Sequence, residues 1–371
     1  MTLLYRLASS LLVLVGAVLV AAVLVLAIGV GPSAAASTFW QGTFGTPANL
    51  GTTLTQAVPL CLVAMGWIIS TRAGRLHVGF PGQIIAGGTV ATVAGLQCGG
   101  LPAPLAVLMT ALAGIAGGVL WAALTAWLWA SRGVIEIVSS LLLNLVAEQV
   151  AAWLVRGPLN GTTDGQPQST NFPAGTLWPT VESLTGRSLS YDVVLMPLCA
   201  VLVVFLLSRT TFGFGLRAAG GNPVAARWSG LDPVRSGVTA ILVSGAFAGL
   251  AGAALLFAGA APWLSDGFEA GAGFNGIAVA LLARNSPVGA VLTAILFSAL
   301  NVGSTALQAQ LDVPSSLAAV VQGAVVVLML LSAALLLRPR SPIAARPSPE
   351  PARQPGPLEP AGPGPAAGRE G

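Results

Sequence analysis

The chain has 371 residues, of which 55% are hydrophobic and only 8% are charged. A soluble domain carries about 25% charged residues, so this composition excludes an ordinary soluble protein and indicates several membrane spans. The formal net charge is +4, and all 16 basic residues are arginines. A chain without lysine can form neither a P-loop nor a Schiff base, so any ATPase that powers it lies on another chain.

Other classes of function are also disfavoured. The three cysteines, Cys61, Cys98 and Cys199, are far apart and form no CxxC pair, which indicates buried thiols. His77 is the only histidine, so we expect no metal site. We find no HExxH or GxSxG signature and therefore expect no catalytic residues and no cofactor. No basic patch with interleaved aromatic residues predicts nucleic-acid binding.

Hydrophobic runs predict an all-α polytopic membrane protein with about ten transmembrane helices. A bilayer core about 30 Å thick requires about 20 apolar residues per helix. Runs of that kind lie near residues 9–29, 51–70, 78–97, 104–130, 134–155, 191–208, 237–259, 270–284, 287–308 and 314–337. The eighth is too short for a plain span. The first exceeds the about 7 to 15 apolar residues of a signal peptide, so we expect a retained helix.

The arginines predict the orientation, because cytoplasmic loops collect basic residues. With the N-terminus inside, only Arg156 and Arg187 of the loop arginines fall outside. We therefore expect a multi-pass membrane protein with both termini in the cytoplasm. The loop 156–190 should be irregular, either a solvated connector or a contact for an external partner. Residues 1–340 form the predicted transmembrane domain, and 341–371, with nine prolines, form a predicted disordered cytoplasmic tail.

Two predicted spans open on glycine-rich breaks. The third begins with residues 79–83 (GFPGQ) and the eighth with residues 271–276 (GAGFNG). Broken helices at membrane depth line cavities or are buried in protein, and a matched pair indicates a transporter's binding site. If spans two to five and seven to ten are repeats, these breaks correspond in an inverted repeat. The alternative is that glycines only allow close packing, as we expect for Gly114 with Gly118 and Gly245 with Gly249.

Polar residues within the spans predict a path for a neutral, hydroxyl-rich solute. Ser140, Asn144 and Glu148 follow each other at four-residue spacing, which places them on one helix face, and Ser298, Asn301 and Thr305 form a similar stripe. An ionised group at the bilayer centre costs roughly 2.5 to 3.5 kcal/mol, so Glu148 should face the bundle interior or water. Hydrogen bonding to substrate, proton relay and contacts between helices remain open. The candidate path residues are Gln83, Ser140, Asn144, Glu148, Phe274, Asn275, Asn301 and Gln322.

A polar stretch, residues 211–235, separates two of the spans and predicts a short helix. Asn222 can cap this helix, Pro223 suits its first position, and Gly230 can end it in a left-handed conformation. Val224 and Trp228, four residues apart, give it one apolar side. A small amphipathic helix between membrane spans is suited to binding another protein.

Four motifs resemble the integral-membrane permeases of ABC importers, in the simple-sugar and nucleoside branch related to the branched-chain amino-acid permeases. They are residues 77–83 (HVGFPGQ), Leu143 and Asn144 with 153–159 (WLVRGPL), 215–230 (GLRAAGGNPVAARWSG) and 273–287 (GFNGIAVALLARNSP). This sequence has His77 and Pro81 where the family commonly has Asn and Glu, and Leu145 where an aromatic residue is frequent.

The resemblance implies that residues 209–236 form a coupling loop whose short helix docks into a cytoplasmic ABC ATPase. The implied coupling residues are Arg217, Asn222, Pro223, Ala225, Ala226, Arg227, Trp228 and Gly230. It also implies a second permease subunit, the same or related, and an extracytoplasmic solute-binding protein. ATP would be used by the partner subunit.

We therefore hypothesise a transport subunit that moves a nucleoside or a simple sugar. A branched-chain amino-acid permease is the first alternative. A secondary transporter driven by protons through Glu148 is the second, and a membrane scaffold without transport is the third.

Overall fold

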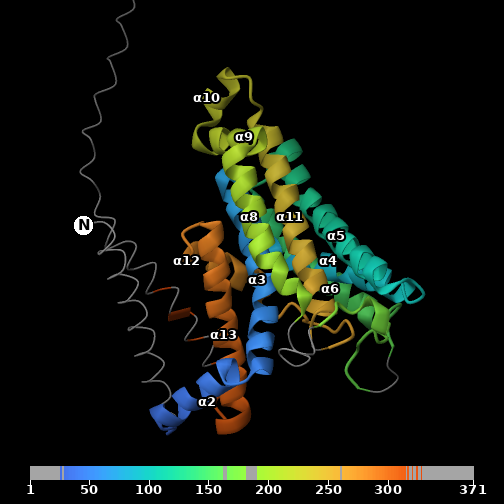
Figure 1. Cartoon of the computed structure of the whole chain (residues 1–371). Helices are drawn as coiled ribbons and strands as arrows, with labels where there is room; N and C mark the ends of the chain where they lie inside the picture. Colours follow the sequence, from blue (N-terminus) through green and yellow to red (C-terminus); the bar gives the residue numbers. More distant parts are fainter. Residues whose placement is uncertain are drawn as a thin grey trace, which may run out of the picture.

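The computed structural model describes residues 26, 29–161, 165–180, 190–259 and 261–314, with residues 316, 320, 323, 324 and 327. Within this part the chain is all-helical, with eleven α-helices and no strand (Figure 1). Most of the first and tenth predicted spans, Gln322 and the tail 341–371 lie outside the described residues.

The described α-helices range in length from 6 residues in α10 to 30 residues in α5. Their bounds are α2 (Pro32–Phe44), α3 (Pro47–Arg72), α4 (Phe80–Gln97), α5 (Ala103–Arg132), α6 (Glu136–Arg156), α8 (Leu195–Arg209), α9 (Thr211–Gly221), α10 (Pro223–Trp228), α11 (Pro233–Phe257), α12 (Ala272–Leu282) and α13 (Pro287–Leu311). Two 3-10 helices, η1 (Ala174–Thr176) and η2 (Tyr191–Val194), lie between α6 and α8.

Six membrane-spanning candidates occur among the described residues: α3, α5, α6, η2 with α8, α11 and α13. The predicted count of ten spans is therefore not confirmed. The eighth predicted span is α12, which has only 11 residues and is too short to cross a bilayer, as expected. Two helices, α2 and α9, were not predicted, because neither has the length or the hydropathy of a span.

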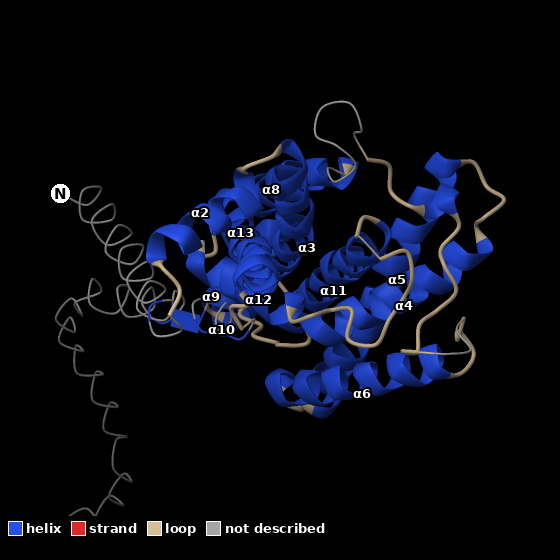
Figure 2. Ribbon diagram, turned by 90° about the horizontal axis from the view of Figure 1, so that it is seen from below, coloured by secondary structure: helices blue, strands red, loops and turns tan. Residues whose placement is uncertain are grey.

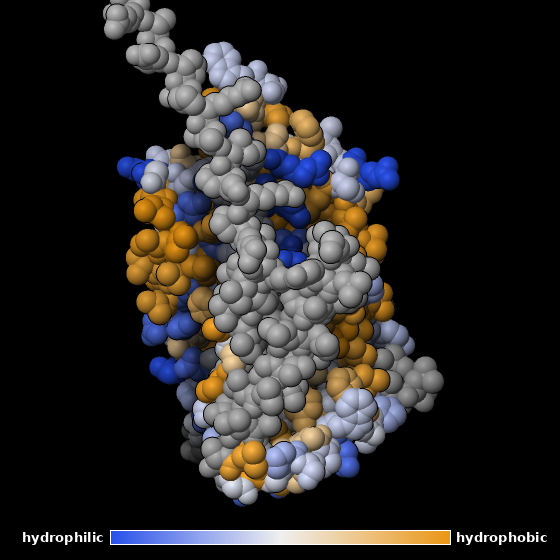
Figure 3. All heavy atoms as spheres, turned by 90° about the vertical axis from the view of Figure 1, so that its left-hand side faces the viewer, coloured by the Kyte–Doolittle hydropathy of each residue, from blue (hydrophilic) through white to orange (hydrophobic). Residues whose placement is uncertain are grey.

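The core is built around α3 and α11. The first, α3, packs against α12 and α13, whereas α11 packs against α4, α5 and α3 itself. In Figure 2, α6 lies at the edge of the bundle beside α4 and α5. Figure 3 shows hydrophobic side chains on both flanks of the visible face. A band of hydrophilic side chains separates these flanks from the end of the molecule that α9 and α10 form. This distribution fits a lipid-facing middle.

Glycines allow α5 and α11 to pack backbone against backbone. A Cβ on Gly118 would overlap the carbonyl oxygen of Gly245, and a Cβ on Gly249 would overlap that of Gly114. The close packing predicted for both glycine pairs is confirmed, and the two pairs face each other.

The loop after α6 is tied to the loop between α11 and α12, at the end of the bundle opposite α10 (Figure 1). The backbone N–H of Ser169 donates to the carbonyl oxygen of Leu264 at 2.9 Å, and that of Phe172 donates to Pro262 at 2.7 Å. Arg156 and Asp266 form an ion pair of 2.8 Å beside them. The described part of this loop is irregular, as predicted, yet its backbone is held by its neighbour.

Candidate functional site

The start of α4 is held by α6. Asn144 accepts a hydrogen bond from the backbone N–H of Gly82 at 3.0 Å and donates one to the carbonyl oxygen of Val78 at 2.9 Å. Ser140 accepts from the N–H of Val78 at 3.1 Å. Two of the predicted path residues therefore satisfy backbone groups that the break in the third predicted span leaves without helical partners. This geometry favours contacts between helices over direct binding of substrate for both side chains.

This break lies beside the middle of α11. His77, just before α4, is fully buried, and its Nε2 lies 2.8 Å from Oγ of Ser244 on α11. Ser244 is eleven residues after Pro233, the first residue of α11. At 1.5 Å per residue it lies about 16 Å from the start of that helix, near the middle of a core about 30 Å thick. The irregular segment before α4 is buried in protein at this depth, as membrane-embedded loops must be.

The second break meets the first. A Cβ on Gly273, in the first turn of α12, would lie 2.6 Å from the backbone nitrogen of Pro81 in the first turn of α4. Glu269, in the loop before α12, accepts hydrogen bonds from the N–H groups of Gly271 at 2.9 Å and Gly273 at 2.5 Å. The pKa of Glu269 is raised overall. Burial of the carboxyl group is the largest cause and the nearby charge of Glu148 adds to it, whereas the hydrogen bonds from the two N–H groups act in the opposite direction.

The remaining predicted path residues do not gather at one place. Glu148 is exposed on α6, whereas Ser140 and Asn144 on the same helix are buried. The physical reason is that four residues turn a helix about 40° beyond a full turn, so eight residues carry a side chain off the original face. Gln83 is fully buried at the break, and Phe274 is half-exposed in the first turn of α12.

The other polar candidates lie on α12 and α13. Asn275 and Asn301 are half-buried. Ser298, from the same stripe as Asn301, donates to the carbonyl oxygen of Thr53 on α3 at 2.6 Å. This stripe therefore joins α13 to α3 through at least one of its members.

Sequence reasoning missed three residues at the breaks: Trp121 on α5, Ser244 on α11 and Glu269. The indole Nε1 of Trp121 lies 2.9 Å from the position that a Cβ on Gly82 would occupy. A tryptophan in the middle of an apolar span is a usable signal, since its N–H requires a partner when buried. Ser244 and Glu269 become visible only when distant helices are brought together.

The bracing of α4 leads to a prediction about stability. Asn144→Ala removes both side-chain bonds and leaves the N–H of Gly82 and the carbonyl oxygen of Val78 buried without those partners. We expect the free energy of unfolding to fall by about 2 kcal/mol. Denaturation of the detergent-solubilised chain measures it. Gln149→Ala, at an exposed position of the same helix, should change it by less than about 0.5 kcal/mol; equal losses would contradict the bracing role.

The predicted short helix is α10, and its capping is confirmed. Oδ1 of Asn222 accepts hydrogen bonds from the N–H groups of Val224 and Ala225, both at 3.0 Å, and Pro223 is the first helical residue. Gly230 has φ +79°, in the left-handed region. α10 lies at the end of the molecule with α9 (Figure 1).

The outward side of α10 is apolar. Its Ala226 is buried, while Val224 is 64% exposed and Trp228 is 88% exposed. Arg227 is also exposed. Leaving a tryptophan almost entirely uncovered on a capped helix is typical of a protein-binding surface.

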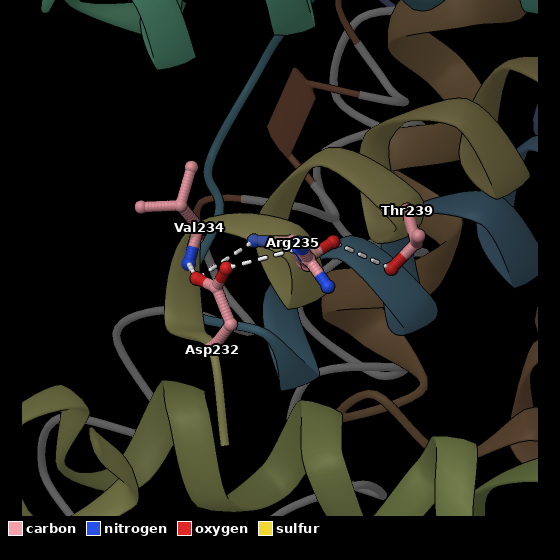
Figure 4. Close-up of polar contacts among 4 residues, drawn as sticks. All are labelled: Asp232, Val234, Arg235 and Thr239. Carbon is pink, nitrogen blue, oxygen red and sulfur yellow. Dashed lines mark hydrogen bonds and ion pairs between the residues drawn. The ribbon is translucent and has the colours of Figure 1, made fainter. Parts of the chain in front are cut away.

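The chain that leaves α10 is fixed to α11, as Figure 4 shows. Oδ1 of Asp232 accepts from the N–H groups of Val234 at 2.9 Å and Arg235 at 3.2 Å, and its Oδ2 pairs with Nε of Arg235 at 3.2 Å. Thr239 donates to the carbonyl oxygen of Arg235 at 2.9 Å. Asp232 therefore caps the first turn of α11 directly after the turn that follows α10.

Comparison with known proteins places the chain in a family. The family model described as the permease component of a branched-chain amino acid transport system matches residues 49–330. The glucose ABC transporter permease protein TsgB13 of Haloferax volcanii is 32% identical over 329 residues, covering 86% of each chain. The guanosine ABC transporter permease protein NupP of Bacillus subtilis is 31% identical over 303 residues, covering 81% of this chain and 86% of that one.

A third relative, the nucleoside ABC transporter permease protein NupB of Lactococcus lactis subsp. cremoris, is 27% identical over 316 residues, covering 83% of this chain and 86% of that one. No solved structure matches the chain. Because the family model and these relatives span nearly all of the helical bundle, the chain belongs to the branched-chain amino acid transport system permease family.

Proposed function

We propose that this chain is the membrane-spanning permease subunit of an ATP-driven importer in a prokaryotic plasma membrane, and that it carries a nucleoside or a simple sugar. The relatives named as glucose, guanosine and nucleoside permeases support this substrate class. The observation that carries the proposal is the exposed apolar side of α10 at one end of a bundle of membrane helices. Such a surface fits a separate cytoplasmic ATPase.

Contacts in the chain provide a route from that surface to the breaks. The ATPase would bind α10, and Asp232 would transmit its movement to α11. Ser244, halfway along α11, holds His77, and His77 stacks on Phe80 at the start of α4, with ring centroids 4.8 Å apart. A shift of α11 would therefore displace the start of α4 and open or close the path beside it.

The packing also supports an inverted repeat of spans two to five and seven to ten. Its first members would be α3 and α11. The former packs against α12 and α13 of the other repeat, and the latter packs against α4 and α5. This reciprocal exchange is what a two-fold relation between the halves would produce.

A second permease subunit, the same or related, would cover the outer side of α6. A hollow of about 360 Å³ lies there. Its lining residues are Leu145, Val146, Gln149, Val150 and Trp153. Glu148 and Gln149 are exposed on this helix, and an exposed carboxylate within a span is costly in lipid. A solute-binding protein would meet the paired loops at the opposite end from α10, and both termini would be cytoplasmic.

A branched-chain amino acid is the second candidate substrate, favoured by the family's description. The carboxylate and ammonium groups of an amino acid would each need a charged or helix-terminal partner. At the meeting of α4 and α12, the carboxylate of Glu269 already accepts two N–H groups, and Gln83 and Trp121 are neutral. This arrangement favours the uncharged solutes.

Transport measurements test the proposal. With the ATPase, the second permease and the solute-binding protein reconstituted in proteoliposomes, we expect uptake of guanosine or glucose to require ATP and to persist when the proton gradient is dissipated. Glu148→Gln should retain most of this uptake, since the side chain remains polar. Uptake driven by a proton gradient without ATP, and lost in Glu148→Gln, would instead support the secondary transporter. Competition by leucine would support an amino-acid permease.

A further inference from the structure

Arg75 joins three helices near the end of the bundle that α9 and α10 form. It lies in the segment between α3 and α4, and its Nη1 is 3.5 Å from Oε1 of Glu136, the first residue of α6. Its Cζ lies 4.3 Å from the ring centroid of Trp129, near the end of α5, within the range of a cation–π contact. A Cβ on Gly237 of α11 would lie 2.7 Å from that ring and 3.2 Å from Cδ of Arg75. We call Arg75, Trp129 and Glu136 the Arg75 clamp.

The ion pair of the Arg75 clamp is shielded from water. The side chains of Arg75 and Glu136 are 26% and 15% exposed, whereas those of Arg156 and Asp266, which also form an ion pair, are 61% and 46% exposed. An exposed ion pair contributes little, but breaking a shielded one leaves a charge without its partner in a medium of low dielectric constant. The position of Glu136, and with it the first turn of α6, therefore depends on Arg75.

The turn that carries Arg75 supports α9. Gly74, just before it, has φ +70°, and a Cβ on Gly220 of α9 would lie 2.8 Å from the backbone nitrogen of Gly74. The same Cβ would overlap the carbonyl oxygen of Arg72, the last residue of α3. The backbone of α9 therefore rests directly on this turn. Because Gly220 is only two residues before Asn222, which caps α10, a short path of backbone contacts joins α10 to Arg75.

The segment before α4 is held by α6 at both of its ends. Glu136 is paired with Arg75, and Asn144, eight residues further along the same helix, is hydrogen-bonded to Gly82 at the break. Eight helical residues span about 12 Å. Residues 75–82 are thus fixed to one stretch of α6, by charge at one end and by hydrogen bonds at the other. A displacement of the turn beneath α9 would reach the start of α4 along this stretch while Arg75 stays paired.

We propose that Arg75 is the positioning residue through which α9 and α10 act on the start of α4, because it keeps residues 75–82 fixed to α5 and α6. The inference rests on the proposed function, since it concerns how ATP hydrolysis is linked to movement of the solute. Arginine suits this position because its planar guanidinium group pairs with Glu136 and stacks on Trp129 at once, whereas the ammonium group of lysine is a compact point charge without a planar face.

The test is the number of solute molecules taken up per ATP hydrolysed by the complete complex in proteoliposomes, with the solute-binding protein present and guanosine or glucose as the probe. Arg75→Gln should lower this ratio about fivefold or more, which is the usual size of a coupling between two sites. ATP hydrolysis, the amount of ATPase that co-purifies and the KM for the probe should stay near wild type. Arg75→Lys should give an intermediate ratio, because it keeps the charge and loses the planar group.

Further variants separate the ion pair from a general loss of charge. Glu136→Gln should also lower the ratio, and its combination with Arg75→Gln should lose little more than Arg75→Gln alone, because both changes remove one ion pair. Arg132→Gln is the matched control. Arg132 is an exposed arginine at the end of α5 with its Cζ 5.9 Å from the ring centroid of Trp127, and its replacement should keep the wild-type ratio. If Arg75→Gln does not fold, Glu136→Gln and Arg75→Lys give the same measurement.

The ratio also distinguishes this role from a structural one. A structural role would lower uptake and ATP hydrolysis together, because fewer complexes would be folded, and an unchanged ratio in Arg75→Gln and Glu136→Gln would overturn the inference while leaving the proposed function intact. An equal loss in Arg132→Gln would overturn it as well. Uptake by the wild-type complex that continues without ATP would overturn the proposed function, and this inference with it.

Discussion

Trp228→Asp is expected to abolish binding of the ATPase while the membrane bundle stays folded. The indole of Trp228 is 88% exposed and buries nothing in the free chain, so its loss removes little stability. In a complex, an aromatic residue at the centre of an interface contributes about 2 kcal/mol or more, and a buried unpaired carboxylate adds a further penalty. Co-purification of the ATPase with the tagged permease measures the effect. Arg227→Glu, which reverses the neighbouring charge, should weaken the complex in the same assay.

Two variants serve as controls for that experiment. Trp228→Phe keeps an apolar ring and should retain most of the complex. Trp40→Asp makes the same change at an exposed tryptophan of α2, at the opposite end of the molecule, and should leave ATPase binding unchanged. An undiminished complex with Trp228→Asp would show that α10 is not the docking helix.

The second large effect is expected at the crossing of α5 and α11. Gly249→Val places a branched side chain where its Cβ alone would overlap the carbonyl oxygen of Gly114. The two helices must separate, and separation would disturb the packing of α11 against α4 as well. We expect the free energy of unfolding to fall by more than about 3 kcal/mol, with loss of folded protein in detergent. Size-exclusion chromatography and thermal unfolding measure both.

Gly221→Val is the matched control. A Cβ on Gly221, at the end of α9, would meet no atom within 4 Å. This variant should therefore change the free energy of unfolding by less than about 0.5 kcal/mol. If Gly249→Val were equally harmless, the crossing of α5 and α11 would have to be looser than the contact between Gly249 and Gly114 implies.

Local signals predicted the local features of the fold. Asn222, Pro223 and Gly230 define α10 through capping and backbone preferences that need no distant partner. The shortness of α12 follows from its hydrophobic run alone. By contrast, hydropathy did not predict α2 and α9, because both helices are too short to be spans. Their stability depends on packing against neighbouring helices. The sequence also could not show that the two glycine pairs face each other, since their pairing depends on how α5 and α11 cross.

The candidate site was predictable only in part, for a similar reason. Spacing placed Ser140 and Asn144 on one face of α6, and the structure keeps them together. It could not show that their hydrogen bonds go to the backbone of α4. Gln83 was identified from its motif, whereas Trp121 and Ser244 reach the same place from helices far along the chain.

The exchange of partners between the two halves has a consequence for synthesis. α3 is largely buried, yet its partners α12 and α13 begin 200 residues or more after its last residue, Arg72. At about 5 to 20 residues per second, a ribosome needs about 10 to 40 s to make that interval. During this time α3 would lie in the bilayer with its protein-binding surface uncovered. The first half of the chain therefore cannot complete its packing until the second half has been synthesised. A chain truncated after α8 should be a substrate for membrane quality control.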